Sequence, residues 1–303
     1  MDRCQRITIR AKMKIETLYP SQCTLGESPV WHKRRGSYFW VDIEDGVLYE
    51  LNAAKTLQTW KLNTRVSLII EQEDDTLLLA IQGGVVRFNP SDGSMTNLVD
   101  LDKDQPQNRC NDGACDADGR LFVSTMDVHC EKDAGNLYRI DKDLIVTKVI
   151  NDLTIPNGIV WSHDHARMYF IETMSRSVKS YIFNRQTGEI FYENVVVSIP
   201  EEMGYPDGMA IDAAGMLWIA LYGGHGVSRW NPETGMLLEK ITLPAPHITN
   251  CTFGGDNLDE LIVTSAREEL TEEQLAQYPE SGSVFIITGL GVKGVENNRS
   301  NHI

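Results

Sequence analysis

The stretch YPDGMAIDAAGMLW, residues 205–218, has the form of a strand, a tight turn and the start of a second strand. Pro, Asp and Gly at its beginning and the Asp-Ala-Ala-Gly sequence at 212–215 are turn formers, and the apolar residues between them suit a strand. The same pattern recurs at residues 109–122, RCNDGACDADGRLF, and its first part recurs at residues 155–161, IPNGIVW. Self-similarity of this kind indicates a repeat fold.

The three copies align at positions that carry side-chain oxygens. When Asp116 is placed on Asp212, Asn111 falls on Asp207, and Asn157 takes the same place in the third copy. An oxygen-bearing side chain therefore recurs once per structural unit. In a repeat fold such positions gather on one face, so this recurrence is the main indication of function in the sequence.

Short apolar runs separated by Gly, Asp and Asn turns occupy nearly the whole chain, and helical periodicity is scarce. Aligning the second strand of each unit gives six copies, at residues 38–42, 76–80, 121–124, 168–171, 217–220 and 261–264. Each is followed by a third strand, and turns such as NPSDG at 89–93 introduce a fourth. A period of about 40 to 50 residues with four strands per unit predicts an all-β fold, a six-bladed β-propeller of four-stranded antiparallel blades.

The two ends of the chain indicate how the ring closes. The sixth unit lacks a fourth strand, whereas residues 14–19, KIETLY, form a strand without a unit of its own. We expect this N-terminal strand to complete the last blade, which would leave no open sheet edge. The sequence TEEQ at 271–274 matches a capping box and predicts one helical turn in a loop across one face of the ring.

These observations predict one domain. We expect residues 1–12 to be a poorly ordered N-terminal extension, residues 13–296 to be the propeller and residues 297–303 to be a polar C-terminal tail. Two β-sandwiches divided near residue 150 are the alternative, but nothing resembling a linker occurs there.

Composition and charge exclude several classes of protein. The 303 residues carry 28 Lys and Arg against 43 Asp and Glu, a net charge of −15 that disfavours binding to nucleic acid. The N-terminus lacks the apolar region of a secretory signal, and no run approaches the roughly 18 apolar residues of a membrane span. The six cysteines show neither a C-x-x-C nor a metal-knuckle pattern. We expect a cytoplasmic protein with free thiols, whose oligomeric state the sequence does not indicate.

In a propeller the first strand of every blade lines the central channel, so equivalent positions converge on the axis. The alignment predicts a ring made by Glu27, Ser67, Asn111, Asn157, Asp207 and Asn250. Burying two carboxylates together is costly unless a cation neutralises them, and an all-oxygen set suits a hard divalent ion. Asn-Gly and Asp-Gly pairs are also turn formers, so any one of these residues could be purely structural. Several of them at one register favour a site.

Five short motifs resemble a known family. They are LGESPVW at 25–31, NDG at 111–113, IPNG at 155–158, YPDG at 205–208 and CTFGG at 251–255. Together they resemble the gluconolactonase, regucalcin (SMP-30) and luciferin-regenerating enzyme family, over about residues 15 to 290. The fold of that family is a six-bladed propeller, in agreement with the repeat count.

The resemblance implies roles for particular residues. Glu27, Asn157 and Asp207 would bind one divalent metal ion, with Ca, Zn, Mn and Mg all open, and Asp207 would also be the catalytic base. Arg109 and Asn111 would contact the sugar substrate. His129 is a further substrate-binding candidate, because it stands where regucalcin has a substrate-contacting glutamate. This departure means that the resemblance does not carry over a substrate preference.

The expected function is hydrolysis of a sugar lactone to the aldonic acid, with a small-molecule lactone as partner. The alternatives are a calcium-binding regulatory protein, an interaction platform without turnover, and hydrolysis of phosphotriesters. A serine hydrolase is disfavoured because the sequence has no G-x-S-x-G motif, and a zinc protease is disfavoured because H-E-x-x-H is absent.

Overall fold

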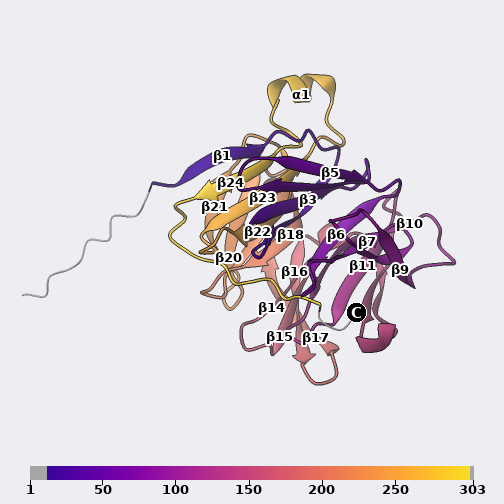
Figure 1. Ribbon diagram of the computed structural model, residues 1–303. Coiled ribbons are helices and arrows are strands. Elements are labelled where there is room, and N and C mark those ends of the chain that lie inside the picture. Colours follow the sequence, from indigo (N-terminus) through magenta and orange to yellow (C-terminus); the bar gives the residue numbers. More distant parts are fainter. Residues whose placement is uncertain (1–11, 301–303) are drawn as a thin grey trace, which may run out of the picture.

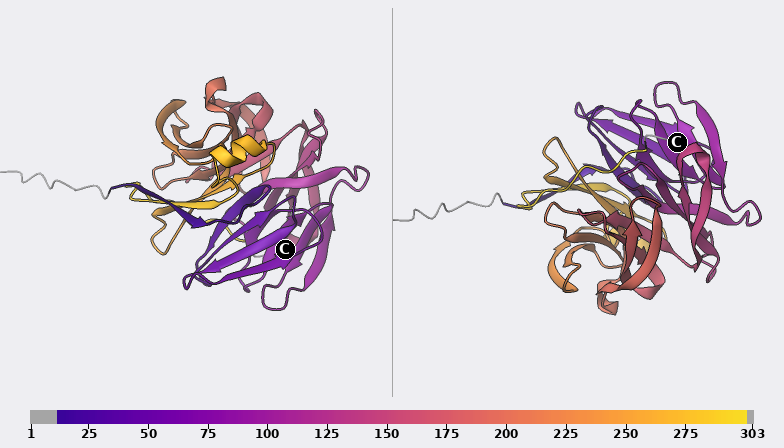
Figure 2. Two further views of the ribbon diagram at one scale, coloured as in Figure 1. Left: turned by 90° about the horizontal axis from the view of Figure 1, so that it is seen from above. Right: turned by 90° about the horizontal axis from the view of Figure 1, so that it is seen from below.

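The protein forms six four-stranded antiparallel sheets arranged around a central axis, which confirms the predicted six-bladed β-propeller. The structure, a computed structural model, describes residues 12–300. Figure 1 shows the ring from the side, and Figure 2 shows it from above and from below. None of the helices in the described part of the chain is long and apolar enough to cross a membrane.

Five blades each use four consecutive strands, of which the first two are largely buried and the fourth is mostly exposed. Blade 1 consists of β2 (Gly26–His32), β3 (Ser37–Asp42), β4 (Val47–Asn52) and β5 (Leu57–Lys61). Blade 2 consists of β6 (Val66–Glu71), β7 (Leu77–Ile81), β8 (Gly84–Phe88) and β9 (Met95–Asp100). Blade 3 consists of β10 (Asn108–Cys115), β11 (Leu121–Asp127), β12 (Gly135–Ile140) and β13 (Val146–Leu153). Blade 4 consists of β14 (Pro156–Trp161), β15 (Arg167–Glu172), β16 (Ser177–Asn184) and β17 (Glu189–Ser198). Blade 5 consists of β18 (Tyr205–Ile211), β19 (Leu217–Tyr222), β20 (Gly226–Asn231) and β21 (Met236–Thr242). Three 3-10 turns, η1 (Lys142–Leu144), η2 (Thr173–Ser175) and η3 (Glu201–Met203), lie between strands.

The sixth blade combines both ends of the chain, as the sequence predicts. Its strands are β22 (His247–Gly254), β23 (Glu260–Ala266), β24 (Val284–Thr288) and, outermost, β1 (Lys14–Tyr19). β1 pairs with β24 in antiparallel register from Lys14 opposite Thr288. The ring is therefore closed by hydrogen bonds between strands that lie far apart in the sequence.

Replacing Leu18 by Ala is expected to lower the free energy of unfolding by about 2 kcal/mol, since Leu18 is buried with Trp40 and Val284 at this closure. Replacing the exposed Glu16 on the same strand by Ala is the control and should change stability little. Chemical denaturation measures both. Equal stability of the two variants would contradict the role of β1 as a packed closing strand.

The Asp-Ala-Ala-Gly turn in the repeated unit has a clear physical basis. The Asp212 carboxylate is fully buried and accepts hydrogen bonds from the backbone N–H of Ala214 and Met216, at 2.9 and 3.0 Å, and from the Trp218 indole at 3.0 Å. Arg229 donates to the same carboxylate at 2.7 Å. One side chain thus closes the turn and fixes the tryptophan of the next strand. Asp116 closes the equivalent turn of blade 3 through the N–H groups of Asp118 and Arg120, so these backbone bonds explain why the pattern recurs.

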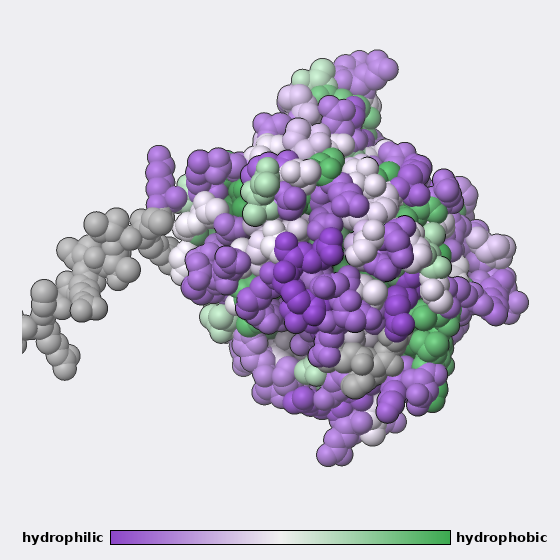
Figure 3. Space-filling view, viewed as in Figure 1, coloured by the Kyte–Doolittle hydropathy of each residue, from purple (hydrophilic) through white to green (hydrophobic). Residues whose placement is uncertain are grey.

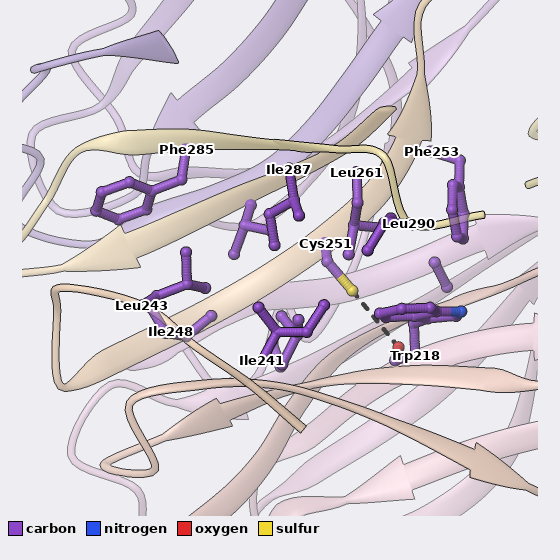
Figure 4. Close-up of a cluster of buried hydrophobic side chains, with 14 of the residues drawn as sticks. Trp218, Ile241, Leu243, Ile248, Cys251, Phe253, Leu261, Phe285, Ile287 and Leu290 are labelled. Carbon is purple, nitrogen blue, oxygen red and sulfur yellow. Dashed lines mark hydrogen bonds between the residues drawn. The ribbon is translucent and has the colours of Figure 1, made fainter. Parts of the chain in front are cut away.

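The hydrophobic core lies between neighbouring blades. Figure 4 shows one such layer, in which Trp218 and Ile241 of blade 5 pack against Phe253, Leu261 and Phe285 of blade 6. A similar cluster joins blades 3 and 4, since Phe122 of β11 contacts Trp161 of β14 with their rings 5.4 Å apart. This core is continuous across residue 150, so the alternative of two β-sandwiches is wrong.

Two segments mark the two faces of the ring. Helix α1 (Glu272–Gln277) lies on one of them, which we call the mouth face, within the loop between β23 and β24. Its capping box is confirmed: the Thr271 hydroxyl accepts from the Gln274 N–H at 3.2 Å, and the Gln274 side chain accepts from the Thr271 N–H at 2.9 Å. The chain after β24 crosses the opposite face, the far face, visible from below in Figure 2.

The predicted domain boundaries are only partly covered by the described residues. Nearly all of the predicted extension at 1–12 and the last part of the predicted tail lie outside them. Within the described part of that tail, the Asn298 side chain donates to the Cys115 carbonyl at 3.0 Å. The Ser300 N–H donates to the Glu71 carbonyl at 3.2 Å, so this segment is hydrogen-bonded to blades 2 and 3.

Candidate active site at the channel mouth

The six ring positions lie on the six innermost strands, and each strand has a bulge there. The register against the second strand of the blade shifts between Glu27 and Val30, Val66 and Leu68, Cys110 and Gly113, Asn157 and Ile159, Pro206 and Met209, and Ile248 and Asn250. A bulge re-aims side chains out of the regular alternation of a strand. All six ring side chains are at most 8% exposed.

Glu27 and Asn250 form one side of the ring. The Asn250 amide donates to the Glu27 carboxylate at 2.8 Å, and the Ser28 N–H donates to the same oxygen at 2.7 Å. The Asn250 carbonyl oxygen is itself held by the Cys251 N–H at 2.8 Å. These bonds fix one carboxylate oxygen of Glu27 and leave the other for a ligand.

A second chain of hydrogen bonds links blades 3, 4 and 5. The Asn111 amide donates to the Pro156 carbonyl at 2.8 Å and to the Asn157 side-chain oxygen at 3.2 Å. The Asn157 amide donates to Thr173 at 2.9 Å, and the Thr173 hydroxyl donates to the Pro206 carbonyl, next to Asp207, at 2.8 Å. The amide orientation of Asn157 is thereby determined, with its oxygen directed back toward the ring.

Arg109 lies beside this chain with only 8% of its surface exposed. Its guanidinium donates to the Cys110 carbonyl at 3.0 Å and to the Asn111 side chain at 2.5 Å through a single nitrogen, Nη1. Burial lowers the pKa of Arg109, whereas the nearby Glu44 and Glu268 carboxylates raise it. The other guanidinium nitrogens have no hydrogen-bond partner in residues 12–300, so they are placed to donate to a ligand.

Three carboxylates share the centre of the channel. Burial raises the pKa of Glu27 to about 8, with the Asp112 charge adding to the shift. Burial, then Glu27 and Asp112, raise the pKa of Asp207 well above its usual range. Burial also raises the pKa of Asp112 to about 6. Asp112 of blade 3 lines the cavity along the channel together with Ser28 and Asn250, which places it near the axis.

This cluster predicts an unusual dependence of stability on pH in the protein without a bound cation. Acids whose pKa is raised by folding bind protons more tightly in the folded state, so they favour folding below about pH 4 and lose that contribution as the pH rises to about 8. Thermal unfolding in a chelator should therefore show a lower midpoint at pH 8 than at pH 5. The Glu27→Gln variant should show a smaller difference. A wild-type midpoint that rises from pH 5 to pH 8 would contradict the assignment.

Gly208 follows Asp207 and is required by close packing. A Cβ atom at this position would lie 2.1 Å from the side-chain carbon Cγ of Asn250. Glycine thus lets the blade-5 strand approach the Asn250 amide that holds Glu27.

Gly208→Ala should displace Asn250 and weaken the binding of a divalent ion by about tenfold or more, measured by calorimetry, because the hydrogen bond to Glu27 would be lost. Gly36→Ala is the control, since it meets no atom within 4 Å and costs only the strain of its positive φ, +58°. Unchanged ion affinity in Gly208→Ala would show that the Asn250 contact does not support the site.

A cavity of about 290 Å³ continues along the channel from the ring toward the far face. Ser28, Asp112 and Asn250 line it at the ring, and residues 295–298 of the C-terminal segment line it at the other end. A substrate that reaches the ring without displacing that segment enters from the mouth face.

Not every predicted residue joins the ring. His129 lies in the exposed turn after β11, where its N–H donates to Asp127 at 2.7 Å, and its side chain makes no hydrogen bond or ring contact within residues 12–300. Asp112 was missed as a candidate, although it stands in the NDG motif beside Asn111. A turn-forming Asp gave no signal that its side chain would reach the axis.

The chain is similar to proteins of one family throughout this fold. Residues 25–267 match the family described as SMP-30/Gluconolactonase/LRE-like region. The chain belongs to this family. Rabbit (Oryctolagus cuniculus) regucalcin is 36% identical over 291 residues, which cover 94% of this chain and 97% of that protein.

Two solved structures show how closely the family fold is kept. A calcium-binding regucalcin from Agrobacterium tumefaciens is 29% identical, with a TM-score of 0.89 over 94% of this chain and 96% of the other. A luciferin-regenerating enzyme is 28% identical, with a TM-score of 0.90 over 96% of this chain and 100% of the other. These likenesses confirm the predicted family membership.

Proposed function

We propose that this protein hydrolyses a sugar lactone to the open-chain aldonic acid with the help of one divalent metal ion at the channel mouth. The observation that carries the proposal is the charge balance of the buried site. Glu27, Asp112 and Asp207 supply three carboxylates, and Arg109 is the guanidinium that acts on Glu27 and Asp207. When all three carboxyls are ionised, a divalent ion would compensate the two remaining negative charges.

The donor atoms fit a hard cation. Glu27, Asn157 and Asp207 offer carboxylate and amide oxygens, as Ca²⁺, Mg²⁺ and Mn²⁺ prefer. Residues 12–300 contain no group of three His, Cys, Asp or Glu side chains arranged for a metal ion, so the proposed set depends on the Asn157 amide and on water for its remaining ligands. Ca, Zn, Mn and Mg were all open from the sequence. A set of oxygen ligands without His or Cys favours Ca, Mg or Mn over Zn.

In the proposed mechanism each of these side chains has a role. A divalent ion bound there would polarise the lactone carbonyl and stabilise the charge that develops on its oxygen. Asp207 accepts the proton of the attacking water, and the proton is then passed to the ring oxygen as the carbon–oxygen bond of the ring breaks. Arg109 donates hydrogen bonds to the sugar from its free nitrogens, and Asn111 orients Arg109. No covalent nucleophile is needed.

A calcium-binding protein without turnover is the second candidate. The Agrobacterium relative is described as a calcium-binding protein, and the same ring could hold an ion with no substrate. Such a protein would not need the unpartnered donors of Arg109 beside the ion site. We therefore favour the lactonase.

We place the reaction in the cytoplasm. Five cysteines in the described part of the chain are free thiols, four of them buried, which suits a reducing compartment. The proposed partner is a small sugar lactone. The face of the molecule drawn in Figure 3 is largely hydrophilic.

The proposal is tested with a pH-indicator assay on a panel of five- and six-carbon aldonolactones, after removal of metal and resupply of single ions. Acid release that depends on an added ion would support the lactonase and identify its substrate. Ion binding by calorimetry with no acid release from any lactone would overturn it in favour of the binding protein.

A further inference from the structure

Glu268 is a residue of the mouth face that the proposed mechanism does not use. It follows the end of β23 by two positions and is the second residue of the segment 267–282 that carries α1. Its N–H donates to the Thr24 carbonyl at 2.9 Å, and the preceding Arg267 N–H donates to the same oxygen at 3.0 Å. These bonds attach the start of the segment to the residues that lead into Glu27.

Glu268 lies at the rim of the channel mouth between blades 1 and 5. Its backbone is hydrogen-bonded to Thr24, three residues before Glu27. The next residue, Glu269, accepts from Tyr222, which pairs with Tyr205 two residues before Asp207. In keeping with this place, the charge of Glu268 acts on Asp207 and Arg109. Its side chain is half-buried, and burial, followed by the Glu44 charge, raises its pKa.

The carboxylates beside Glu268 already have partners. Glu44 accepts hydrogen bonds from both Nε and Nη2 of Arg65, the shortest at 2.7 Å. Arg65 also donates to Gln82 at 3.2 Å. The Glu268 carboxylate has no hydrogen-bond partner within residues 12–300, so it is a free acceptor at the mouth.

The segment that carries Glu268 is held in place on its other side. The Tyr222 hydroxyl donates to Glu269 at 3.2 Å, and the Tyr222 ring stacks on His247 with centroids 4.0 Å apart and planes 10° apart. Tyr278, at the end of α1, contacts His225 with ring centroids 5.1 Å apart. The segment therefore forms a fixed wall beside Asp207, and an acceptor on it keeps a defined position.

We propose that Glu268 is a specificity-determining residue that accepts hydrogen bonds from hydroxyl groups of a polyhydroxylated lactone whose carbonyl faces Asp207. A carboxylate is acceptor-only and pairs strongly with hydroxyl donors, and Arg109 on the other side of the mouth is donor-only. The two would select a substrate with hydroxyls along its ring over an unsubstituted lactone of the same ring size. This inference rests on the proposed lactonase function.

The test compares wild type, Glu268→Gln and Glu268→Ala on glucono-1,5-lactone and on δ-valerolactone, which has the same ring without hydroxyls. Both variants should lose roughly 10- to 100-fold in kcat/KM on the hydroxylated lactone, mainly through KM, and little on δ-valerolactone. Metal affinity by calorimetry should change much less than kcat/KM on the hydroxylated lactone, and the thermal midpoint should not fall. Glu272→Gln on α1, exposed on the same segment, is the matched control and should behave as wild type.

The outcomes separate this inference from the proposed function. An active wild type with unaffected Glu268 variants, a loss confined to kcat, or an equal loss on both lactones would overturn the role of Glu268 alone. A wild type inactive on every lactone would overturn the proposed function and this inference with it.

Discussion

Replacing Asp207 by Asn should lower kcat/KM for lactone hydrolysis by roughly 1,000-fold or more, because the variant loses both a proton acceptor and a charged ligand while it keeps the shape of the side chain. Asp207 is 8% exposed on β18, and its pKa is raised by burial and by the Glu27 and Asp112 charges. Asparagine cannot accept the proton of water. Steady-state kinetics with saturating metal ion measures the loss.

The control for this prediction is Asp143→Asn. Asp143 is exposed in η1, which joins the two outer strands of blade 3, and has a positive φ of 62° that asparagine also tolerates. This variant should keep wild-type activity. An Asp207→Asn protein that is folded and hydrolyses lactones at a near-normal rate would exclude Asp207 as the base.

Replacing Glu27 by Gln should weaken the binding of the divalent ion by roughly 100-fold, since the site loses one of the two carboxylates proposed to contact the ion. The amide can still accept from the Asn250 amide and the Ser28 N–H, which hold Glu27 at 2.8 and 2.7 Å. The fold around it should therefore be retained. Isothermal titration calorimetry on metal-stripped protein gives the affinity.

Glu202→Gln is the matched control for Glu27, because Glu202 is exposed in η3. It should bind the ion as wild type does. Proton release on ion binding is a second readout: the pKa of Glu27, about 8, means that this carboxyl is largely protonated at pH 7 and must lose its proton to a bound ion. Unchanged affinity and unchanged proton release in Glu27→Gln would remove Glu27 from the ion site.

The fold could be predicted from the sequence because the turns, the strands and the helix cap each indicated the structure that forms there. The Asp212 turn recurs at Asp116 since in both copies the carboxylate accepts from backbone N–H groups of the turn. The strand at 14–19 had no unit of its own, and closing the ring was the one arrangement that left no open edge. Helix α1 followed from its capping box, since both of its hydrogen bonds depend on residues three positions apart.

The candidate site could be predicted less completely. The alignment of the repeats predicted that Glu27, Asn157 and Asp207 occupy equivalent positions on the first strands of their blades. The direction of their side chains also depends on the β-bulges at these positions, which no local propensity encodes. Those bulges also bring Asp112 to the channel.

Loop residues were the hardest to place. Glu268 depends on how the segment 267–282 folds back over the mouth, which is set by contacts with Thr24 and Tyr222 from distant parts of the chain. His129 could be aligned with a family position, yet it lies in an exposed turn whose side chain makes no contact in the described structure. Its predicted role in substrate binding stays a prediction.

The most direct test of the central claim is to titrate metal-stripped protein with Ca²⁺ while the initial rate of lactone hydrolysis is measured, and to repeat the titration with Mg²⁺, Mn²⁺ and Zn²⁺. The account predicts no turnover in chelator, a rate that rises in proportion to the effective ion and a plateau at about one ion per chain. Full turnover in chelator, or a rate that none of these ions restores, would contradict it.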